Sequence, residues 1–225
     1  MNLNSYKKIL VFQVIIITFA LILTSKPSFG QSKENSQESP IVVCQASRVA
    51  LYQKQIDKLL SLIQQRLLIQ SFVAQWKWNH NNAIEAPERE QVLLAQLRKQ
   101  APAYGLDPDV VVVFFQWQIF AGKLIQISNF QSWQKQGIEF FDNVPDLNRT
   151  LRPSLDKLSP EILSALATLS PVLNCPILQQ IIQSRAQIIL RGDAIDDTVR
   201  RIAIAPLIEL KGISCRDIPG LDIKN

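Results

Sequence analysis

The chain has 225 residues, enough for one good-sized hydrophobic core, and its 7 glycines and 47% apolar residues favour helices over a turn-rich β fold. Its formal net charge is +5, but three lysines and no acidic residue lie in residues 1–30, so 21 basic residues face 19 acidic ones in the remainder, a net charge of +2. A domain with so small a surplus lacks the basic surface of nucleic-acid-binding proteins, and we expect no nucleic-acid partner.

The first thirty residues have the pattern of a secretory signal peptide. Lys7 and Lys8 precede an apolar run over residues 9–23, and Ser28 and Gly30 are small residues at positions −3 and −1 of a cleavage point. An uncleaved membrane anchor, the alternative interpretation, needs a longer apolar run. We therefore predict export, to the periplasm or the medium, with no membrane contact after the signal is removed.

Export bears on the three cysteines, Cys44, Cys175 and Cys215. They are too few and too widely spaced for a zinc motif, and histidine is nearly absent, so we predict no metal site. An oxidising compartment favours a Cys175–Cys215 disulfide, the alternative being two buried thiols. Cys44 is then left over, either as a buried thiol or paired between chains.

The rest of the chain predicts an all-α fold. Residues 31–46 are expected to form a flexible linker, because residues 31–40 are polar and low in apolar content. Pro87 and the sequence Asp107-Pro108-Asp109 are typical of helix starts. Residues 110–113 alone would favour a strand, but the apolar segment continues far beyond strand length. Helices are predicted over residues 47–79, 87–100, 107–133, 153–169 with a break near Pro160, 176–191 and 195–210, with a loop at 142–152.

The first predicted helix carries two cations on a face that begins apolar. Arg66 and Lys77 are eleven residues apart, which places them about 20° apart in helical phase and roughly 16 Å apart along the axis. Two long cations on one face could converge on a small anion; alternatively, the face drifts into solvent. Trp76 and Trp78 flank Lys77 and are expected to pack against neighbouring helices. The full face consists of Tyr52, Ile56, Leu59, Ile63, Arg66, Gln70, Val73 and Lys77.

The third predicted helix has a polar stripe in an otherwise apolar surface. Gln118, Gly122 and Gln126 are spaced at i, i+4 and i+8. A buried glutamine needs a hydrogen-bond partner. Because Gly122 weakens a helix, we expect another group to approach it closely. The alternative is a stripe that faces solvent.

Further charges lie at helix starts. Arg89 and Glu90 occupy the first turns of the second helix, and Arg152 precedes Pro153. Neither arginine gains from the helix dipole there. A surface ion pair is the simpler interpretation of Arg89 and Glu90. Together the candidate site residues amount to four cations, one acid and one amide, with no nucleophile and no base.

These residues belong to an ordered set: Arg66, Lys77 eleven residues on, Arg89-Glu90 twelve further on, LDPD at 106–109, Gly122, Gln126, Trp133, LRPSLD at 151–156 and the two late cysteines. Over residues 47–215 this set resembles the exported (gamma) subclass of the all-α chorismate mutases. The resemblance implies catalytic helices over residues 47–152 and a C-terminal helical extension, 153–225, that completes one compact domain tied by the Cys175–Cys215 disulfide. It also implies a homodimer.

The resemblance implies a reaction without a cofactor, the [3,3] rearrangement of chorismate to prephenate. Arg66, Arg89 and Arg152 are then expected to bind or orient the substrate carboxylates, because a guanidinium fork can engage a carboxylate bidentately. Lys77 and Gln126 should donate to the ether oxygen, which gains negative charge as its C–O bond breaks. The residues to which the resemblance assigns catalysis are Lys77, Gln126, Arg89, and Glu90, which should accept a hydrogen bond from the ring hydroxyl.

Two positions depart from the family pattern. Ala86 stands where many relatives have an acid, and Gly122, also expected at the substrate, stands where relatives often have serine or threonine.

Two alternative functions remain open. Within the same fold, the alternative to a chorismate mutase is an isochorismate–pyruvate lyase. The alternative of another class is an exported helical binding module, for a small dicarboxylate or a protein partner.

Overall fold

A computed structural model describes residues 40–209 of the chain, with side chains from residue 48 onward. A 3₁₀ helix, Ala101–Tyr104, follows α3, and a π-helical turn, Leu147–Leu151, leads into α5. The residues described contain helices and no strand, so the predicted all-α fold is confirmed. The α-helices are α2 (Pro40–Asn79), α3 (Pro87–Gln100), α4 (Pro108–Gln136), α5 (Arg152–Leu169), α6 (Pro176–Ile189) and α7 (Asp197–Ile208).

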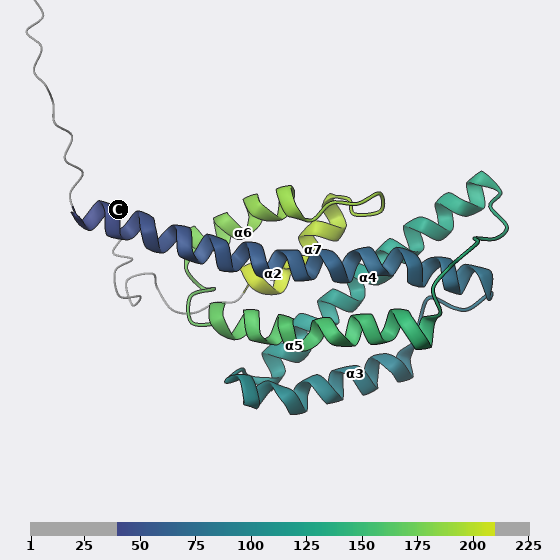
Figure 1. The fold of residues 1–225 in the computed structure, drawn as a ribbon, viewed down its shortest axis with the longest axis horizontal. Coiled ribbons are helices and arrows are strands. Elements are labelled where there is room, and N and C mark those ends of the chain that lie inside the picture. Colours follow the sequence, from purple (N-terminus) through teal and green to yellow (C-terminus); the bar gives the residue numbers. More distant parts are fainter. Residues whose placement is uncertain (1–39, 210–225) are drawn as a thin grey trace, which may run out of the picture. The chain divides into compact units, whose positions relative to one another are not determined.

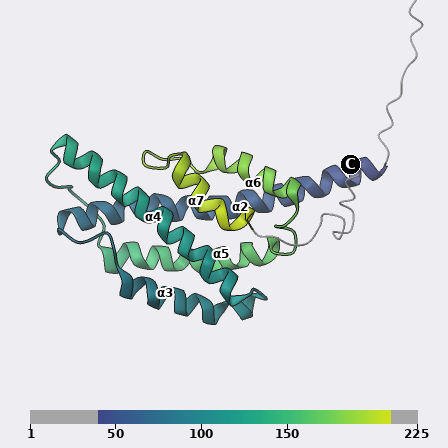
Figure 2. The same cartoon turned by 180° about the vertical axis from the view of Figure 1, so that it is seen from behind.

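Helix α2 is the element against which most of the others pack. It contacts α4, α5 and α6, while α3 and α7 pack against α4 (Figure 1). Seen from behind, α4 crosses α2 and lies over the bundle (Figure 2). One continuous hydrophobic core takes side chains from every one of these helices, among them Leu60, Leu97, Phe115, Ile162, Ile182 and Ala203.

Local sequence sets both ends of α4. The Asp107 carboxylate accepts hydrogen bonds from the backbone N–H groups of Asp109 and Val110, at 2.7 and 3.3 Å, as expected for an N-cap. Gly137 ends the helix with φ of 66°, a left-handed conformation that glycine adopts without strain. The valines at 110–113 are helical, so the packing of a 29-residue helix outweighs their preference for strands. By length and composition α4 would also suit a membrane span, but here it is a packed helix of the bundle.

Of the C-terminal helices, α5 and α6 pack against α2, while α7 packs against α4 and α6. Arg185 of α6 forms a bidentate ion pair with Asp57 of α2, with Nε–Oδ1 and Nη2–Oδ2 distances of 2.6 and 2.9 Å. Cys175, directly before α6, is fully buried. The disulfide expected between it and Cys215 stays a prediction, because Cys215 lies outside the described residues.

Several boundaries differ from those predicted, among them the end of α4, which extends to Gln136 instead of residue 133. Helix α2 begins at Pro40, so the segment expected to remain a linker through residue 46 is helical from Pro40 onward. The loop expected at 142–152 contains the π-helical turn, whose first N–H groups bond to the Asp146 carboxylate, and α5 already begins at Arg152. The ends of α6 and α7 differ by two residues at most, the usual uncertainty of helix termini.

The break predicted at Pro160 does not occur. Helix α5 runs without interruption from Arg152 to Leu169, with Pro160 inside it. Proline removes one backbone hydrogen bond from a helix interior and crowds the preceding turn. On the next turn Ile162 and Leu163 are fully buried in the core, and tertiary packing of this kind holds the helix together across the proline.

Candidate active site

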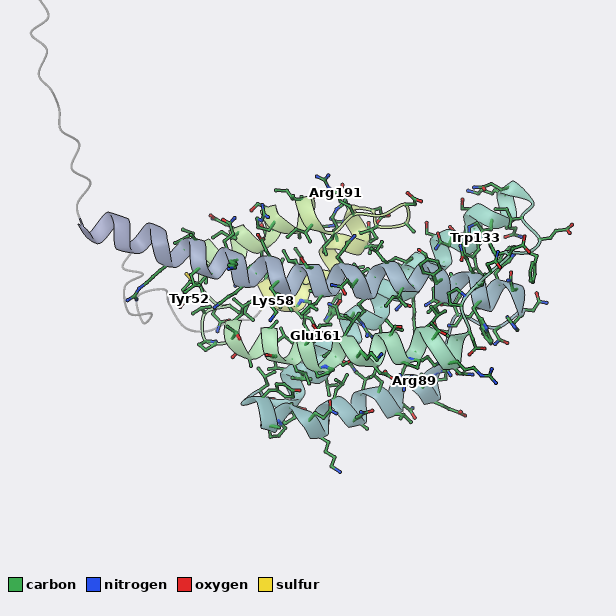
Figure 3. The ribbon with its side chains drawn as sticks, viewed as in Figure 1. Tyr52, Lys58, Arg89, Trp133, Glu161 and Arg191 are labelled. Carbon is green, nitrogen blue, oxygen red and sulfur yellow. The ribbon has the colours of Figure 1, made fainter. Side chains whose placement is uncertain are left out.

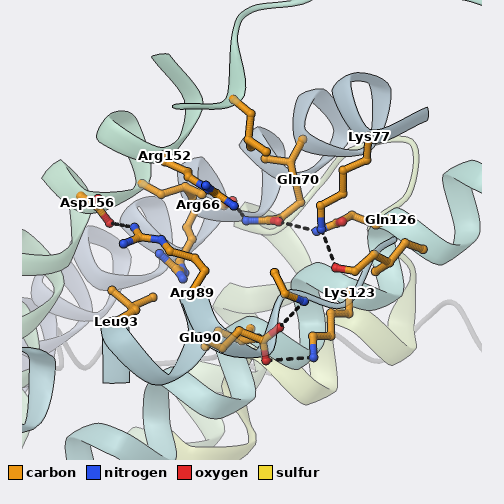
Figure 4. A pocket seen from close by; sticks show the side chains of 16 residues that line it. Arg66, Gln70, Lys77, Arg89, Glu90, Leu93, Lys123, Gln126, Arg152 and Asp156 are labelled. Atoms are coloured by element: carbon orange, nitrogen blue, oxygen red, sulfur yellow. Dashed lines mark hydrogen bonds and ion pairs between the residues drawn. The ribbon is translucent and has the colours of Figure 1, made fainter. Parts of the chain in front are cut away.

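The cations predicted on α2 face inward. Arg66 and Lys77 are 3% and 6% exposed, and Gln70 between them is 8% exposed, so this face does not drift into solvent. Around them α2, α3, α4 and the start of α5 enclose one pocket (Figure 4). Six of the seven residues expected at the substrate line it: Arg66, Lys77, Arg89, Glu90, Gln126 and Arg152.

Arg66 is a buried cation with unused hydrogen-bond donors. Its Nε and Nη1 atoms are buried and have no hydrogen-bond partner. Its guanidinium lies 5.5 Å from the centroid of the Phe115 ring, within the range of a cation–π contact. Burial, with a smaller contribution from nearby Arg89 and against the opposing effect of Asp156, lowers the pKa of Arg66 to about 10. A charged group so placed is short of an anionic partner.

Lys77 lies in the last turn of α2, and its ammonium donates a hydrogen bond to the backbone carbonyl of Ile84. Burial is the largest of several effects that together lower the pKa of Lys77 to about 8. The cations Arg152 and Lys123 act in the same direction, and the carboxylates of Glu90 and Glu85 oppose them. An ammonium has three N–H donors, so two remain for a ligand in the pocket.

Each member of the polar stripe on α4 has its own buried surroundings. The Gln118 amide donates to the backbone carbonyl of Ala203 in α7, at 2.7 Å, and therefore holds helices together. The Gln126 amide donates to Oε1 of Gln70, at 2.9 Å, and its second N–H is left for a ligand. All three members are buried, so the alternative of a stripe facing solvent is wrong.

Gly122 does not line the pocket, although it was expected at the substrate. A Cβ atom at this position would lie 2.9 Å from Cδ of Gln70, closer than such atoms approach one another. The group expected to approach Gly122 closely is therefore the Gln70 side chain. Because position 122 has no side chain, Gln70 can lie across α4 and reach Gln126.

The two arginines from α3 and α5 are each held by a polar neighbour. Arg89 forms an ion pair with Asp156 of α5, and the Arg152 guanidinium donates to the side-chain oxygen of Asn148. Arg89 does not pair with Glu90, so the simpler interpretation of these two as one surface ion pair is wrong. Both guanidinium groups are thus oriented before any ligand binds.

Glu90 is held from two sides. Its Oε1 accepts a hydrogen bond from the backbone N–H of Ala86 at 3.3 Å, and its Oε2 lies 2.9 Å from Nζ of Lys123. Lys123 also bonds to the Glu85 carboxylate. The helix start at Ala86 thus offers a backbone donor where an acidic side chain was expected from the family pattern.

The tryptophans beside Lys77 attach the end of α2 to other parts of the fold. The Trp78 ring packs edge-on against Phe130 and Trp133 of α4, with ring centroids 5.1 and 5.7 Å away, and its indole N–H donates to the Ile138 carbonyl at 3.1 Å. Figure 3 shows Trp133 at the end of the bundle opposite Tyr52. Trp78 therefore fixes the turn of α2 that carries Lys77.

Sequence reasoning gave no binding or catalytic role to three polar residues of the pocket, Gln70, Lys123 and Asp156. Each follows at helical spacing from a residue that was named. Gln70 lies four residues after Arg66, Lys123 three before Gln126, and Asp156 four after Arg152. Their position on the same helix face as a named residue was the available sequence signal. Only the packing of the helices shows which of these faces line the pocket.

Comparison with known proteins gives these residues a family. The family model described as Chorismate mutase type II matches residues 54–126, which include Arg66, Lys77, Glu90 and Gln126. A secreted chorismate mutase of Mycobacterium tuberculosis is 28% identical over 147 residues, covering 65% of this chain and 73% of that protein. A secreted chorismate mutase of Mycolicibacterium smegmatis is 29% identical over 119 residues, covering 53% of this chain and 65% of that protein.

A solved structure extends the likeness to about two thirds of the chain. The crystal structure of chorismate mutase from Burkholderia thailandensis is 30% identical, with a TM-score of 0.61. The alignment covers 68% of this chain and 98% of that one. The chain therefore belongs to the exported, all-α chorismate mutases.

Proposed function

We propose that this chain rearranges chorismate to prephenate in the pocket between α2, α3, α4 and the start of α5. The observation that carries the proposal is the buried Arg66 guanidinium, two of whose nitrogens have no hydrogen-bond partner. A cation in that state is stabilised by an anion that brings its own acceptor atoms. Chorismate, with two carboxylates, is such an anion.

In this proposal the arginines bind and shape the substrate. Arg66, Arg89 and Arg152 approach the pocket from α2, α3 and α5, so they surround a small molecule from different directions. Asp156 and Asn148 hold two of these guanidinium groups in place before binding. Fixed carboxylate contacts hold the substrate in the folded conformation that reacts, which is mainly an orientation effect.

Lys77 and Gln126 then act on the ether oxygen. Lys77 has two N–H donors beyond its bond to the Ile84 carbonyl, and Gln126 has one beyond its bond to Gln70. Negative charge develops on the ether oxygen as its C–O bond breaks. Donors already in position stabilise that charge more than they stabilise the bound substrate, and this difference lowers the barrier.

Glu90 accepts a hydrogen bond from the ring hydroxyl. Each carboxylate oxygen keeps a lone pair after its bond to Ala86 or Lys123.

We further propose that the mature protein works in the periplasm or the medium and forms a homodimer. Light scattering of the purified protein tests the dimer, with a monomeric mass contradicting it.

The activity is tested with the chain lacking residues 1–30. Incubation with chorismate should yield prephenate without an added metal or cofactor. The Lys77→Ala variant should lose turnover by orders of magnitude, while Lys54→Ala, which removes an exposed lysine from the same helix, should keep it. Pyruvate release would indicate the lyase instead. Folded protein without any turnover would indicate a binding module.

A further inference from the structure

Lys123 is a cation of the pocket to which the proposed reaction assigns no role. It lies three residues before Gln126 on α4, so both side chains project from the same face of the helix. Its side chain is only 18% exposed, and Figure 4 shows its ammonium against the Glu90 carboxylate. The Nζ–Oε2 distance is 2.9 Å, that of a charge-assisted hydrogen bond.

Glu90 shares the pocket with two lysines. Lys123 bonds to it directly, and Lys77 lines the same pocket, where the Glu90 charge acts to raise the pKa of Lys77. A carboxylate in a partly buried pocket pairs with whichever cation it can reach, because desolvated charges attract strongly. If Glu90 moved to Lys77, it would take one of the two free ammonium donors and offset the positive charge that should stabilise the ether oxygen.

We infer that Lys123 is a positioning residue: it holds the Glu90 carboxylate against α4 and so leaves Lys77 free to donate to the substrate. This inference rests on the proposed function of the pocket. Lys123 itself need not touch the substrate. Its effect on catalysis passes through Glu90, whose second oxygen is held by the Ala86 N–H on α3.

Glu85 completes the arrangement. It also bonds to the Lys123 ammonium, from the segment between α2 and α3. A lysine beside a site for a dianion would otherwise be drawn toward the substrate carboxylates. The Glu85 side chain is largely exposed, so this second bond is weaker than the bond to Glu90. Together the two carboxylates keep the ammonium at the rim of the pocket.

The inference is tested with Lys123→Met, which removes the charge and keeps the length, and with Lys123→Arg, which keeps the charge. A matched control is Arg98→Met. Arg98 and Asp109 form a second ion pair between α3 and α4, at 2.6 Å, but both side chains are exposed and lie outside the pocket. Arg98→Met therefore shows what the loss of an α3–α4 ion pair does when the pocket itself is unchanged.

For Lys123→Met we expect kcat/KM to fall about tenfold, the effect of one charge-assisted hydrogen bond, with most of the loss in kcat. Lys123→Arg should recover most of it, and Arg98→Met should match the wild type. The alkaline limb of the kcat/KM profile should also move to higher pH in Lys123→Met. The reason is that Lys123 is one of the cations that lower the pKa of Lys77, so its loss raises that pKa. Glu90, Glu85 and Arg152 continue to act on the pKa of Lys77 as before.

A double variant separates positioning from a direct role. If Lys123 acts through Glu90, adding Lys123→Met to Glu90→Gln should lower kcat/KM little further. Fully additive losses would overturn the inference, as would a Lys123→Met enzyme with unchanged kcat and an unchanged alkaline limb. If Lys123→Met does not fold, Lys123→Gln carries the same tests. A wild-type chain that leaves chorismate unreacted would instead refute the proposed function.

Discussion

Lys77 should set an upper pH limit for substrate capture. Its pKa lies near 8, lowered first by burial and then by the charge of Arg152. The proposed mechanism needs the charged form, which donates to the ether oxygen. We therefore expect kcat/KM to be level at neutral pH and to fall above pH 8, because kcat/KM reports ionisations of the free enzyme.

The size of the decline follows from the pKa. At a value of about 8, roughly nine in ten molecules carry a protonated Lys77 at pH 7, and about one in ten at pH 9. An ordinary lysine would still be more than about 90% protonated at pH 9. The pKa of Lys123 is raised and that of Arg66 lies near 10, so neither accounts for a decline between pH 8 and 9.

The assay is the initial rate of chorismate loss from pH 5 to 9.5, at substrate concentrations below and above KM. Bound dianion favours protonated Lys77, so kcat should decline at higher pH than kcat/KM. Lys77→Arg keeps its charge throughout and, if it retains measurable turnover, should show no decline. Because the Gln126 amide does not titrate, kcat/KM should change little between pH 5 and 7. A wild-type kcat/KM that stays level to pH 9.5 would refute the reasoning about Lys77.

Other substitutions test the packing around the site. Arg66→Met should lower kcat/KM at least about 100-fold. It should nevertheless raise the free energy of unfolding by about 1–2 kcal/mol, because it removes a desolvated cation. Chemical denaturation measures this stability, and a variant less stable than the wild type would contradict the expectation. Gly122→Ser should displace the Gln70 side chain, because Cδ of Gln70 would lie 2.9 Å from the new Cβ. The displacement should lower kcat/KM about tenfold. A variant with wild-type kinetics would show that Gln70 does not orient Gln126. Trp78→Leu should cost about 2–3 kcal/mol of stability and should also lower kcat, because the last turn of α2 loses its packing on α4. Thermal unfolding and steady-state rates measure the two effects. A destabilised variant with full kcat would show that Trp78 does not position Lys77.

The helices and most of the site residues were within reach of sequence reasoning. A separation of eleven residues fixes the relative phase of Arg66 and Lys77 on any α-helix, whatever surrounds it. Whether that face is buried depends on which helices cover it. The sequence therefore placed the two cations on one helix face, but it did not determine whether that face is exposed to solvent or lines a buried pocket.

Contacts across helices were the part that sequence could not supply. Arg89 stood next to Glu90 in the chain, yet its partner is Asp156, which is 67 residues away. Pro160 suggested a break, because its local effect is visible in the sequence and the packing that offsets it is not. Gly122 was noticed for its missing side chain, but the neighbour that needs the space became evident only from the crossing of α2 and α4.

One chain supplies every residue to which the proposed reaction gives a role: Arg66, Lys77, Arg89, Glu90, Gln126 and Arg152. We therefore predict that a protomer rearranges chorismate without a residue from a partner. For an exported enzyme this independence matters, because dilution favours the dissociation of any dimer. The rate per protomer should stay the same at dilutions where a dimer has dissociated, and a rate that falls on dilution would show that a partner completes the pocket.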